Sequence, residues 1–281
     1  MMLYIFQFFN RIIYSLIPPR IISFIAYSRI GKMYALLFKY KGLAVFETTS
    51  NIKLELSYLE AKSLGVLYLG DFGITESEFI RSRLNPCGVF FDIGAYVDGW
   101  YSMIAQQIVS TTGKVYAFEP IPEYVKRLKK QYVINNVKNI KIIEKAVHDQ
   151  DNTLEMLEMN EGEFMSLEEY SSYKASKKNK IKVQTISLDT FCLQEKLKKV
   201  DFIKIDVDYH ELQVLHGAKR ILSTMLDLEL LVEVHKEVQM PVIQFMHSLG
   251  YKTYAFWKNK LVLYDLAHSD YDDLFFTRKT L

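Results

Sequence analysis

The sequence has little cysteine and no pattern of metal-binding residues. Cys87 and Cys192 are its only cysteines, and neither belongs to a CxxC pair or has a histidine near it at the spacing of a zinc site. This excludes a disulfide framework and a structural metal, and it predicts small buried side chains in a reducing cytoplasm. We therefore expect a cytoplasmic protein without a metal ion.

Two further features are missing: a large net charge and a long hydrophobic run. The 35 basic and 33 acidic residues leave a net charge of +2, so the chain lacks the basic field that dominates nonspecific nucleic-acid binding. No apolar run approaches the ~20 residues that span a bilayer. Nucleic acid and a transmembrane helix are not expected. The 281 residues, 49% of them hydrophobic, suit one large domain or a domain with an appendage.

Residues 1–46 differ from the rest of the chain. They are rich in aromatic residues and isoleucine and almost devoid of acidic ones, and Pro18 and Pro19 interrupt them. The pattern predicts a helical extension of two short amphipathic helices, without the order of features of a cleavable signal. Such helices contact a membrane surface, here the inner membrane face, or pack on protein as a lid or homodimer contact. Both interpretations stay open, and residues 47–281 form the expected main domain.

The central motif begins with an apolar run at 89–91 that ends in Asp92. Gly94, Ala95 and Gly99 follow, and a helix-like pattern resumes at Trp100. The order predicts a buried parallel strand, a tight turn and a helix, in which glycines let the backbone approach a ligand. Such a turn is a weak signal alone, because many α/β proteins have one without binding anything.

A second motif strengthens the first. Gly113 precedes an apolar strand, KVYAFEP, which ends in Glu119, 20 residues beyond Gly99. An acidic residue at this place can accept hydrogen bonds from both hydroxyls of a ribose. A nucleoside-binding site is therefore favoured over a solvated glutamate before a proline turn.

Two later strands end in polar residues. DFIKIDVD places Asp206 at a strand end, and LELLVEVHK places Glu233 and His235 at the next. Ligands of open α/β sheets bind outside the carboxyl ends of the strands, so these side chains are expected in one crevice with Asp92 and Glu119. A histidine beside a carboxylate is a candidate general base. A structural hydrogen bond at the strand end is the alternative for His235.

These stretches carry a resemblance to a known family. FDIGAYVDGW, YAFEPIP, DFIKIDVDYHELQVLHGA and LVEVH resemble the successive motifs of FkbM-type methyltransferases, over roughly residues 75–281. The resemblance implies S-adenosylmethionine as cofactor. It also implies an α/β, Rossmann-like class I methyltransferase fold, with a mostly parallel seven-stranded sheet that includes one antiparallel strand.

The resemblance also assigns residues. The expected cofactor-binding residues are Asp92, Gly94, Ala95, Tyr96, Asp98, Gly99, Glu119, Pro120, Ala146, Val147 and Asp206. The catalytic candidates are Asp206, Glu211, Glu233 and His235.

The implied activity is O-methylation of a hydroxyl on a sugar, glycan or small metabolite. Transfer from a sulfonium needs alignment of donor and acceptor and removal of the hydroxyl proton. A noncatalytic cofactor-binding scaffold, associated with a membrane or not, is the alternative. A nicotinamide dehydrogenase is disfavoured because a full GxGxxG is missing.

Two positions depart from the family pattern. Tyr209 stands where the family has a glycine, two residues before Glu211, and Asp98 stands within the glycine turn. The ring of Tyr209 is expected to change the shape of the acceptor site or reduce activity. Asp98 could engage the positively charged methionine portion of the cofactor.

The remaining pattern predicts ordinary connecting elements. A capping box at Thr75 and Glu78 predicts a helix, and Gly217 is expected inside the helix that follows Glu211. The stretch 139–149 is expected to form a third strand of the sheet, and 161–180 an exposed loop. Further predictions are helices at 122–136 and 241–250, a hairpin turning at 258–260 and a terminal strand after it.

Overall fold

The computed structural model describes residues 43–57, 66, 71, 73–158, 164–166, 180–257, 260–265 and 273–281. The chain divides into two compact units, one of Met1–Ile80 and Lys129–Lys138 and the other of Arg81–Leu128 and Asn139–Leu281. The predicted helical extension lies outside the described residues, except that its last four residues belong to a strand, Leu43–Glu47. Within the described ranges, no helix has the length and hydropathy to cross a membrane.

The first unit contains a small antiparallel sheet closed by amide side chains. Its strands are β1 (Leu43–Glu47) and β2 (Lys53–Ser57). The Gln131 amide accepts from the Glu55 N–H at 2.9 Å and donates to the Glu55 carbonyl at 2.8 Å, and Asn135 bonds both backbone groups of Lys53 in the same way. These side chains satisfy the edge of β2 as a further strand would.

Two helices cross the boundary between the units, α5 (Ile74–Arg83) and α7 (Pro122–Ile134). The other elements of the second unit are, in chain order, β3 (Val89–Ile93), α6 (Trp100–Gln106), β4 (Lys114–Phe118), β5 (Ile140–Ile143), β6 (Ala146–Val147), β7 (Thr153–Glu158), β8 (Phe164–Ser166), β9 (Lys180–Ile186), α9 (Leu188–Gln194), β10 (Phe202–Ile205), α10 (Glu211–His216), α11 (Lys219–Thr224), β11 (Glu229–Glu233), α12 (Lys236–Ser248), β12 (Lys252–Trp257), β13 (Lys260–Leu263) and β14 (Asp273–Thr277).

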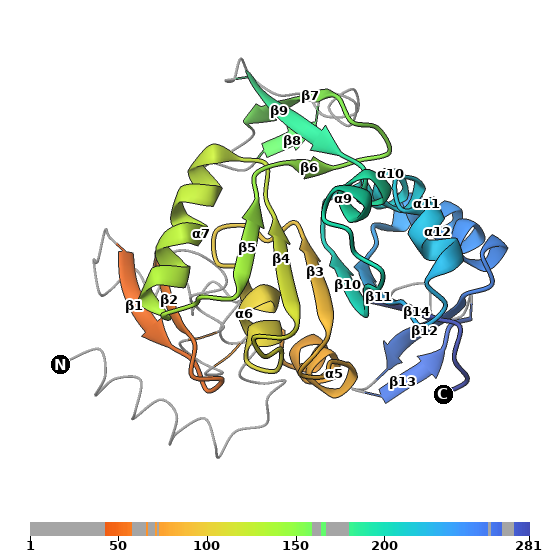
Figure 1. Cartoon of the computed structure of the whole chain (residues 1–281), viewed down its shortest axis with the longest axis horizontal. Helices are drawn as coiled ribbons and strands as arrows, with labels where there is room; N and C mark the ends of the chain where they lie inside the picture. The colour runs from red at the N-terminus through yellow and green to blue at the C-terminus, as the bar shows by residue number, and fades with distance from the viewer. Residues whose placement is uncertain are drawn as a thin grey trace, which may run out of the picture. The chain divides into compact units, whose positions relative to one another are not determined.

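The second unit is built on a sheet of strand order β13-β12-β14-β11-β10-β3-β4-β5 (Figure 1). The strands from β11 to β5 are parallel, while β14 pairs antiparallel with both β11 and β12. This confirms the expected mostly parallel sheet with an antiparallel strand near one end. The hairpin partner β13 adds an eighth strand that also runs antiparallel to the main direction, so the sheet has eight strands and two antiparallel members where seven and one were expected.

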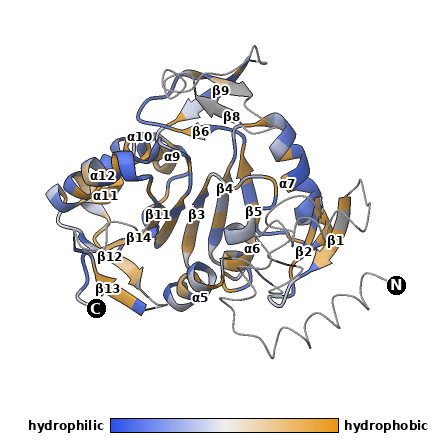
Figure 2. Ribbon diagram, turned by 180° about the vertical axis from the view of Figure 1, so that it is seen from behind, coloured by the Kyte–Doolittle hydropathy of each residue, from blue (hydrophilic) through white to orange (hydrophobic). Residues whose placement is uncertain are grey.

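The core of the second unit follows from its buried strands. Phe90, Phe91 and the four residues of β10 are almost inaccessible to solvent, because parallel strands here are covered on both faces. Figure 2 shows hydrophobic residues along the strands of this sheet and hydrophilic ones along much of α7. The continuous apolar runs therefore predicted these strands correctly.

The expected third strand is split between two sheets. Only β5 (Ile140–Ile143) joins the large sheet, whereas Ala146 and Val147 form β6 and pair with β9 in a small sheet of order β6-β9-β7-β8. The prediction of one strand over 139–149 was wrong because the chain turns between them, where the Lys145 N–H donates to the Ile143 carbonyl. The predicted loop contains β8, and most of its other residues lie outside the described ones.

Several helix boundaries differ from their predictions. Helix α5 starts at Ile74, so Thr75 lies in its first turn and does not precede it. Gly217 ends α10 and is not inside a longer helix. Its backbone is that of an ordinary helical residue, but a Cβ would lie 2.1 Å from the His148 carbonyl oxygen. Gly217 is therefore required by close packing.

The last elements follow the prediction more closely. Helix α12 begins at Lys236, earlier than expected, and Gly250 beyond its end has φ +83°, the left-handed stop. The hairpin of β12 and β13 and the terminal strand β14 are present. The predicted turn residues Lys258 and Asn259 lie outside the described ones.

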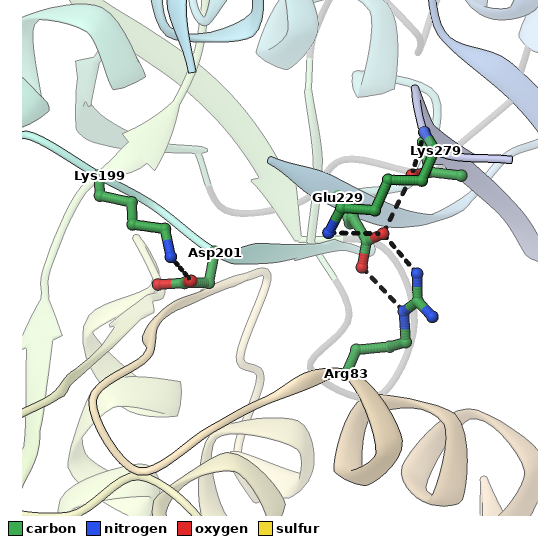
Figure 3. A network of polar contacts seen from close by, with 6 residues as sticks. Arg83, Lys199, Asp201, Glu229 and Lys279 are labelled. Atoms are coloured by element: carbon green, nitrogen blue, oxygen red, sulfur yellow. Dashed lines mark hydrogen bonds and ion pairs between the residues drawn. The ribbon is translucent and has the colours of Figure 1, made fainter. Parts of the chain in front are cut away.

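The amino ends of the central strands are joined by a polar network (Figure 3). Glu229, buried at the start of β11, accepts from Arg83 of α5 and from the Thr277 hydroxyl of β14 at 3.0 Å, with Lys279 at 3.4 Å. Asp201 accepts from the Val89 N–H at 2.9 Å and pairs with Lys199. This end of the sheet is thus occupied by structural ion pairs, and the predicted site lies at the other end.

Candidate active site

The turn after β3 brings two strand ends together. The N–H groups of Gly94 and Ala95 both donate to the Phe118 carbonyl at 3.0 Å, and the Asp206 N–H donates to the Ile93 carbonyl at the same distance. Gly94 has φ +87°, and a Cβ there would lie 1.9 Å from the Asp206 carbonyl oxygen. A glycine is therefore needed for this approach of β3 and β10.

Two acidic residues, Asp92 of β3 and Asp98 of the turn after it, hold helix α6. The Asp92 carboxylate accepts from the N–H of Ser102 at 2.8 Å and from its hydroxyl, and Asp98 Oδ1 accepts from the Trp100 N–H at 3.0 Å. Gly99, at the N-cap position, has φ +59°. Burial raises the pKa of Asp92 to about 6, against the two bonds from Ser102. Both acids thus position the turn, and Ser102 is a contributor that the sequence did not single out.

Glu119 lies directly after β4 with its carboxylate buried. Oε2 accepts from the Tyr96 N–H at 3.0 Å and Oε1 from the Ile121 N–H at 2.9 Å. Burial raises the pKa of Glu119 to about 7, although both hydrogen bonds lower it. Each oxygen keeps a lone pair for another donor. The Tyr96 ring packs edge-on against Tyr124 beside this carboxylate, with ring centroids 4.8 Å apart.

The charges at these strand ends suit a cationic nucleoside. Asp98 and Asp206 raise the pKa of Asp92, and Asp92 and Asp98 raise that of Glu119. Such mutual repulsion is relieved by a positive ligand. Ribose hydroxyls are donors for Glu119, and a sulfonium supplies the positive charge, so the residues present fit S-adenosylmethionine.

A buried lysine joins the ends of β10, β11 and β14. The Lys204 ammonium lies 3.1 Å from Asp273 Oδ1 and 3.8 Å from Glu233 Oε2, with the Tyr101 ring 5.3 Å away. Burial opposes its charge, but Asp273, Tyr101, Asp206 and Glu233 raise the pKa of Lys204 well above its ordinary value. Lys204 is thus a buried positive charge that compensates the carboxylates of Asp273, Asp206 and Glu233.

Glu233 is a carboxylate near Lys204, and its pKa is raised. Burial and the charge of Asp206 raise the pKa of Glu233 to about 7, and Lys204 opposes the rise. This places the pKa of Glu233 near neutral pH, in the range that suits proton exchange with a substrate.

His235 follows β11 and contacts the loop after β10. Its Nε2 lies 3.1 Å from Asp208 Oδ1, and its ring stacks on Tyr209 with centroids 4.0 Å apart and an angle of 11° between planes. Burial lowers the pKa of His235, but the hydrogen bond to Asp208 and the charges of Glu211, Asp208 and Glu233 raise it on balance. The expected pairing of this histidine with a carboxylate is present, and its partner is Asp208.

Glu211 lies at the first position of α10 and is inaccessible to solvent. Its Oε1 accepts from the Tyr209 N–H at 3.2 Å, whereas Oε2 is buried without a hydrogen-bond partner among the described residues. Burial is the main cause that raises the pKa of Glu211. Its position is that of a residue that holds the Asp208 and Tyr209 loop in place.

The structure does not bring every predicted residue to the same sheet. Ala146 and Val147 pair with Thr185 and Ile186 of β9 in the small sheet, and Pro120 follows Glu119 on the way to α7. Lys204, Asp208 and Asp273 were missed by the sequence analysis. A lysine within the apolar run FIKI is a signal that could have found Lys204, whereas Asp273 is 69 residues away and only the topology places it.

The sheet order and the acidic residues at its carboxyl edge define a class I, Rossmann-like methyltransferase fold, as expected. The FkbM methyltransferase domain family matches residues 92–253, more than half of the chain. The chain therefore belongs to the FkbM methyltransferase family, and S-adenosylmethionine is its methyl donor.

Solved structures of low sequence identity resemble the chain. Methyltransferase FkbM from Methylobacillus flagellatus KT is 15% identical with a TM-score of 0.44, over 88% of this chain and 59% of that one. Precorrin-6y C5,15-methyltransferase from Geobacter metallireducens GS-15 is 13% identical with a TM-score of 0.41, over 71% and 83%. Aeropyrum pernix fibrillarin, in complex with natively bound S-adenosyl-L-methionine, is 14% identical with a TM-score of 0.39, over 69% and 67%. No curated protein matches the chain.

Proposed function

We propose that this methyltransferase methylates a hydroxyl oxygen of a sugar, a glycan or a small metabolite. The observation that carries the proposal is the hydrogen bond between His235 and Asp208, which follow β11 and β10, the second and first strands from β3 and its Gly94 turn. A hydroxyl is a poor nucleophile until it loses its proton, and an imidazole held by a carboxylate can accept that proton.

Different residues of the chain bind the cofactor and transfer the proton. S-adenosylmethionine, when bound, supplies an electrophilic methyl group on a positively charged sulfur. Glu119 holds the ribose and the carboxylates of the Gly94 turn favour the positive charge. His235 takes the hydroxyl proton, and Asp208 stabilises the imidazolium that forms. Asp206 and Glu233 orient the acceptor beside it.

Mass spectrometry of metabolites and glycans, incubated with the protein and methyl donor, tests the proposal. The expected product gains one methyl group on oxygen. A product methylated on nitrogen or carbon contradicts the proposed acceptor, and the lack of any product across these pools favours a noncatalytic cofactor-binding scaffold.

Substitution of the proposed base gives a second test once a product is found. His235→Gln keeps polarity but removes the base, so we expect turnover to fall by ~100-fold or more. Asp206→Asn is expected to lose methyl transfer while remaining folded and binding the cofactor. His247→Gln, at the far end of α12 where Nε2 contacts Thr253, is the matched control. Full activity in His235→Gln would reject the histidine as base.

A further inference from the structure

The loop between β10 and α10 has an unusual backbone. Asp208 and Tyr209 have φ of +36° and +67°, so two successive residues other than glycine lie in or beside the left-handed region. Each costs about 1 kcal/mol or more relative to glycine, and such strain persists only where the surroundings enforce it. A feature that outweighs this cost is therefore expected at these two residues.

Three contacts hold the loop in this conformation. The Tyr209 N–H donates to the buried Glu211 carboxylate at 3.2 Å. The Tyr209 ring lies flat on the His235 imidazole, and Asp208 Oδ1 lies 3.1 Å from His235 Nε2. The two strained residues thus place the Tyr209 ring over the face of the His235 imidazole and the Asp208 carboxylate at its edge.

The hydrogen bond to Asp208 does not fix the imidazole alone. The Asp208 side chain is 74% exposed, and exposed ion pairs contribute little to stability because water competes for both partners. A stacked aromatic ring restricts the imidazole plane and is worth more than its buried area alone. Tyr209 fixes the plane of the His235 imidazole and Asp208 fixes its rotation within that plane. The direction of the other ring nitrogen, Nδ1, is thereby defined.

We propose that Tyr209 is a positioning residue for His235: its stacked ring holds the imidazole plane so that Nε2–H donates to Asp208, which keeps the proton of the neutral imidazole on Nε2 and leaves Nδ1 to accept the proton of the methyl acceptor. The proposal rests on the proposed role of His235 as base. It agrees with the start of α12, where His235 occupies the N-cap position but its side chain makes no capping hydrogen bond. Nδ1 is therefore not used to hold the helix.

The proton balance of the step is simple. The hydroxyl oxygen forms a bond to the methyl carbon while the carbon–sulfur bond breaks and its electron pair stays on sulfur. The hydroxyl proton passes to Nδ1, and the Nε2–H of the resulting imidazolium still donates to Asp208. Carboxylates face the charged ring from three elements, Asp208 in the loop, Glu211 on α10 and Glu233 on β11.

Nitrogen chemical shifts of His235 in the full chain, measured above the imidazole pKa, report which ring nitrogen holds the proton. We expect Nε2–H in the wild type and in Tyr209→Phe, which keeps the ring. Tyr209→Gly frees the imidazole plane and so weakens the Nε2–Asp208 hydrogen bond, which should shift the tautomer ratio about 2- to 10-fold towards Nδ1–H, the magnitude expected for loss of an aromatic contact. Tyr209→Asn tolerates the left-handed backbone without a ring, and it serves if the glycine variant does not fold.

Two results would overturn the proposal: Nδ1–H in the wild type, or a wild-type tautomer ratio in both ring-deleted variants. The measurement needs no methyl acceptor. A failure of the tautomer test therefore rejects the role of Tyr209 alone, whereas failure to find an O-methylated product rejects the proposed function and leaves the tautomer ratio unchanged.

Discussion

At the scale of single residues, the site is a set of carboxylates whose charges burial disfavours. Asp92, Glu119 and Glu233 each have a raised pKa, with burial as the largest cause. Asp92 compensates with two hydrogen bonds from Ser102, and Glu233 has Lys204 near it. Among the described residues, Glu119 accepts hydrogen bonds from backbone donors alone, so a ligand that donates hydrogen bonds would add most at this carboxylate.

Glu119 is therefore expected to control cofactor affinity. Glu119→Gln removes charge-assisted hydrogen bonds to the ribose and should weaken S-adenosylhomocysteine binding by about 1.5–3 kcal/mol in calorimetry. Glu123→Gln, an exposed residue of the first turn of α7, is the matched control. Equal affinities of the two variants would count against the ribose assignment.

The pH dependence of the same binding follows from the raised pKa. The ligand binds the ionised carboxylate. In the free protein the pKa of Glu119 is about 7, so half of the Glu119 carboxylates are protonated at that pH. Affinity should therefore fall as pH decreases below 7 and reach a plateau above it. The dependence should be weaker in Glu119→Gln, where Asp92 and Glu233 still titrate, and a wild-type affinity that is constant between pH 6 and pH 8 would contradict the prediction.

At the scale of elements, close packing decides positions that sequence patterns leave open. The buried strands β3, β4 and β10 were predictable because a strand covered on both faces needs a continuous apolar run. The place of Gly217 was not, because its requirement comes from a carbonyl 69 residues earlier in the chain. The pairing of Ala146 and Val147 with β9 also depends on residues that a local pattern does not include.

Gly217 and Gly250 offer a test that separates packing from backbone conformation. Gly217→Ala places a methyl group against the His148 backbone and should lower the free energy of unfolding by about 1–3 kcal/mol or more. Gly250→Ala meets no atom closer than 3.8 Å and should cost about 1 kcal/mol, from the left-handed backbone alone. Urea denaturation of both variants measures the difference, and a larger loss for Gly250→Ala would refute this account.

The two ion pairs at the amino ends of the strands are expected to contribute differently to stability, because one is buried and the other exposed. Glu229 is nearly inaccessible and holds α5, β11 and β14 through Arg83 and Thr277 (Figure 3). Glu229→Ala should cost about 3–5 kcal/mol, because Arg83 loses the carboxylate that compensates its partly buried charge. Lys199→Ala removes an exposed partner of Asp201 and should cost under about 1 kcal/mol. Thermal or urea unfolding distinguishes the two, and equal losses would contradict the assignment.

At the scale of the whole molecule, the sequence predicted the sheet but not how its last strands meet the site. The order of motifs and the family resemblance were sufficient for the parallel strands β3, β4, β10 and β11 and for the placement of Asp92, Glu119, Asp206 and His235 at or beyond their carboxyl ends; the roles of these four residues stay predictions. The contact of Lys204 with Asp273 could not be predicted, because it depends on β14 lying beside β11. Carboxylates that are distant in sequence become neighbours only through this topology.

The two cysteines differ in exposure, and the buried one can report unfolding of the second unit. Cys87 is exposed, so the expectation that both cysteines are buried was wrong for it, whereas Cys192 is buried in α9 and burial raises its pKa to about 12. We expect a thiol reagent to modify Cys87 rapidly in the native protein and Cys192 only after unfolding, since the thiolate is the reactive form. Mass spectrometry of the labelled peptides checks this, and rapid native labelling of Cys192 would show that α9 opens locally.

The position of β14 also sets an order of events during synthesis. The ribosome makes β12 and β13 before β14, yet β14 lies between β11 and β12 in the finished sheet. A nascent chain that has emerged only as far as residue 265 can assemble the strands from β5 to β11, but the free edge of β11 then has no native neighbour. Until the next dozen residues emerge, this edge is open to non-native pairing. During that time Lys204 also lacks its contact with Asp273.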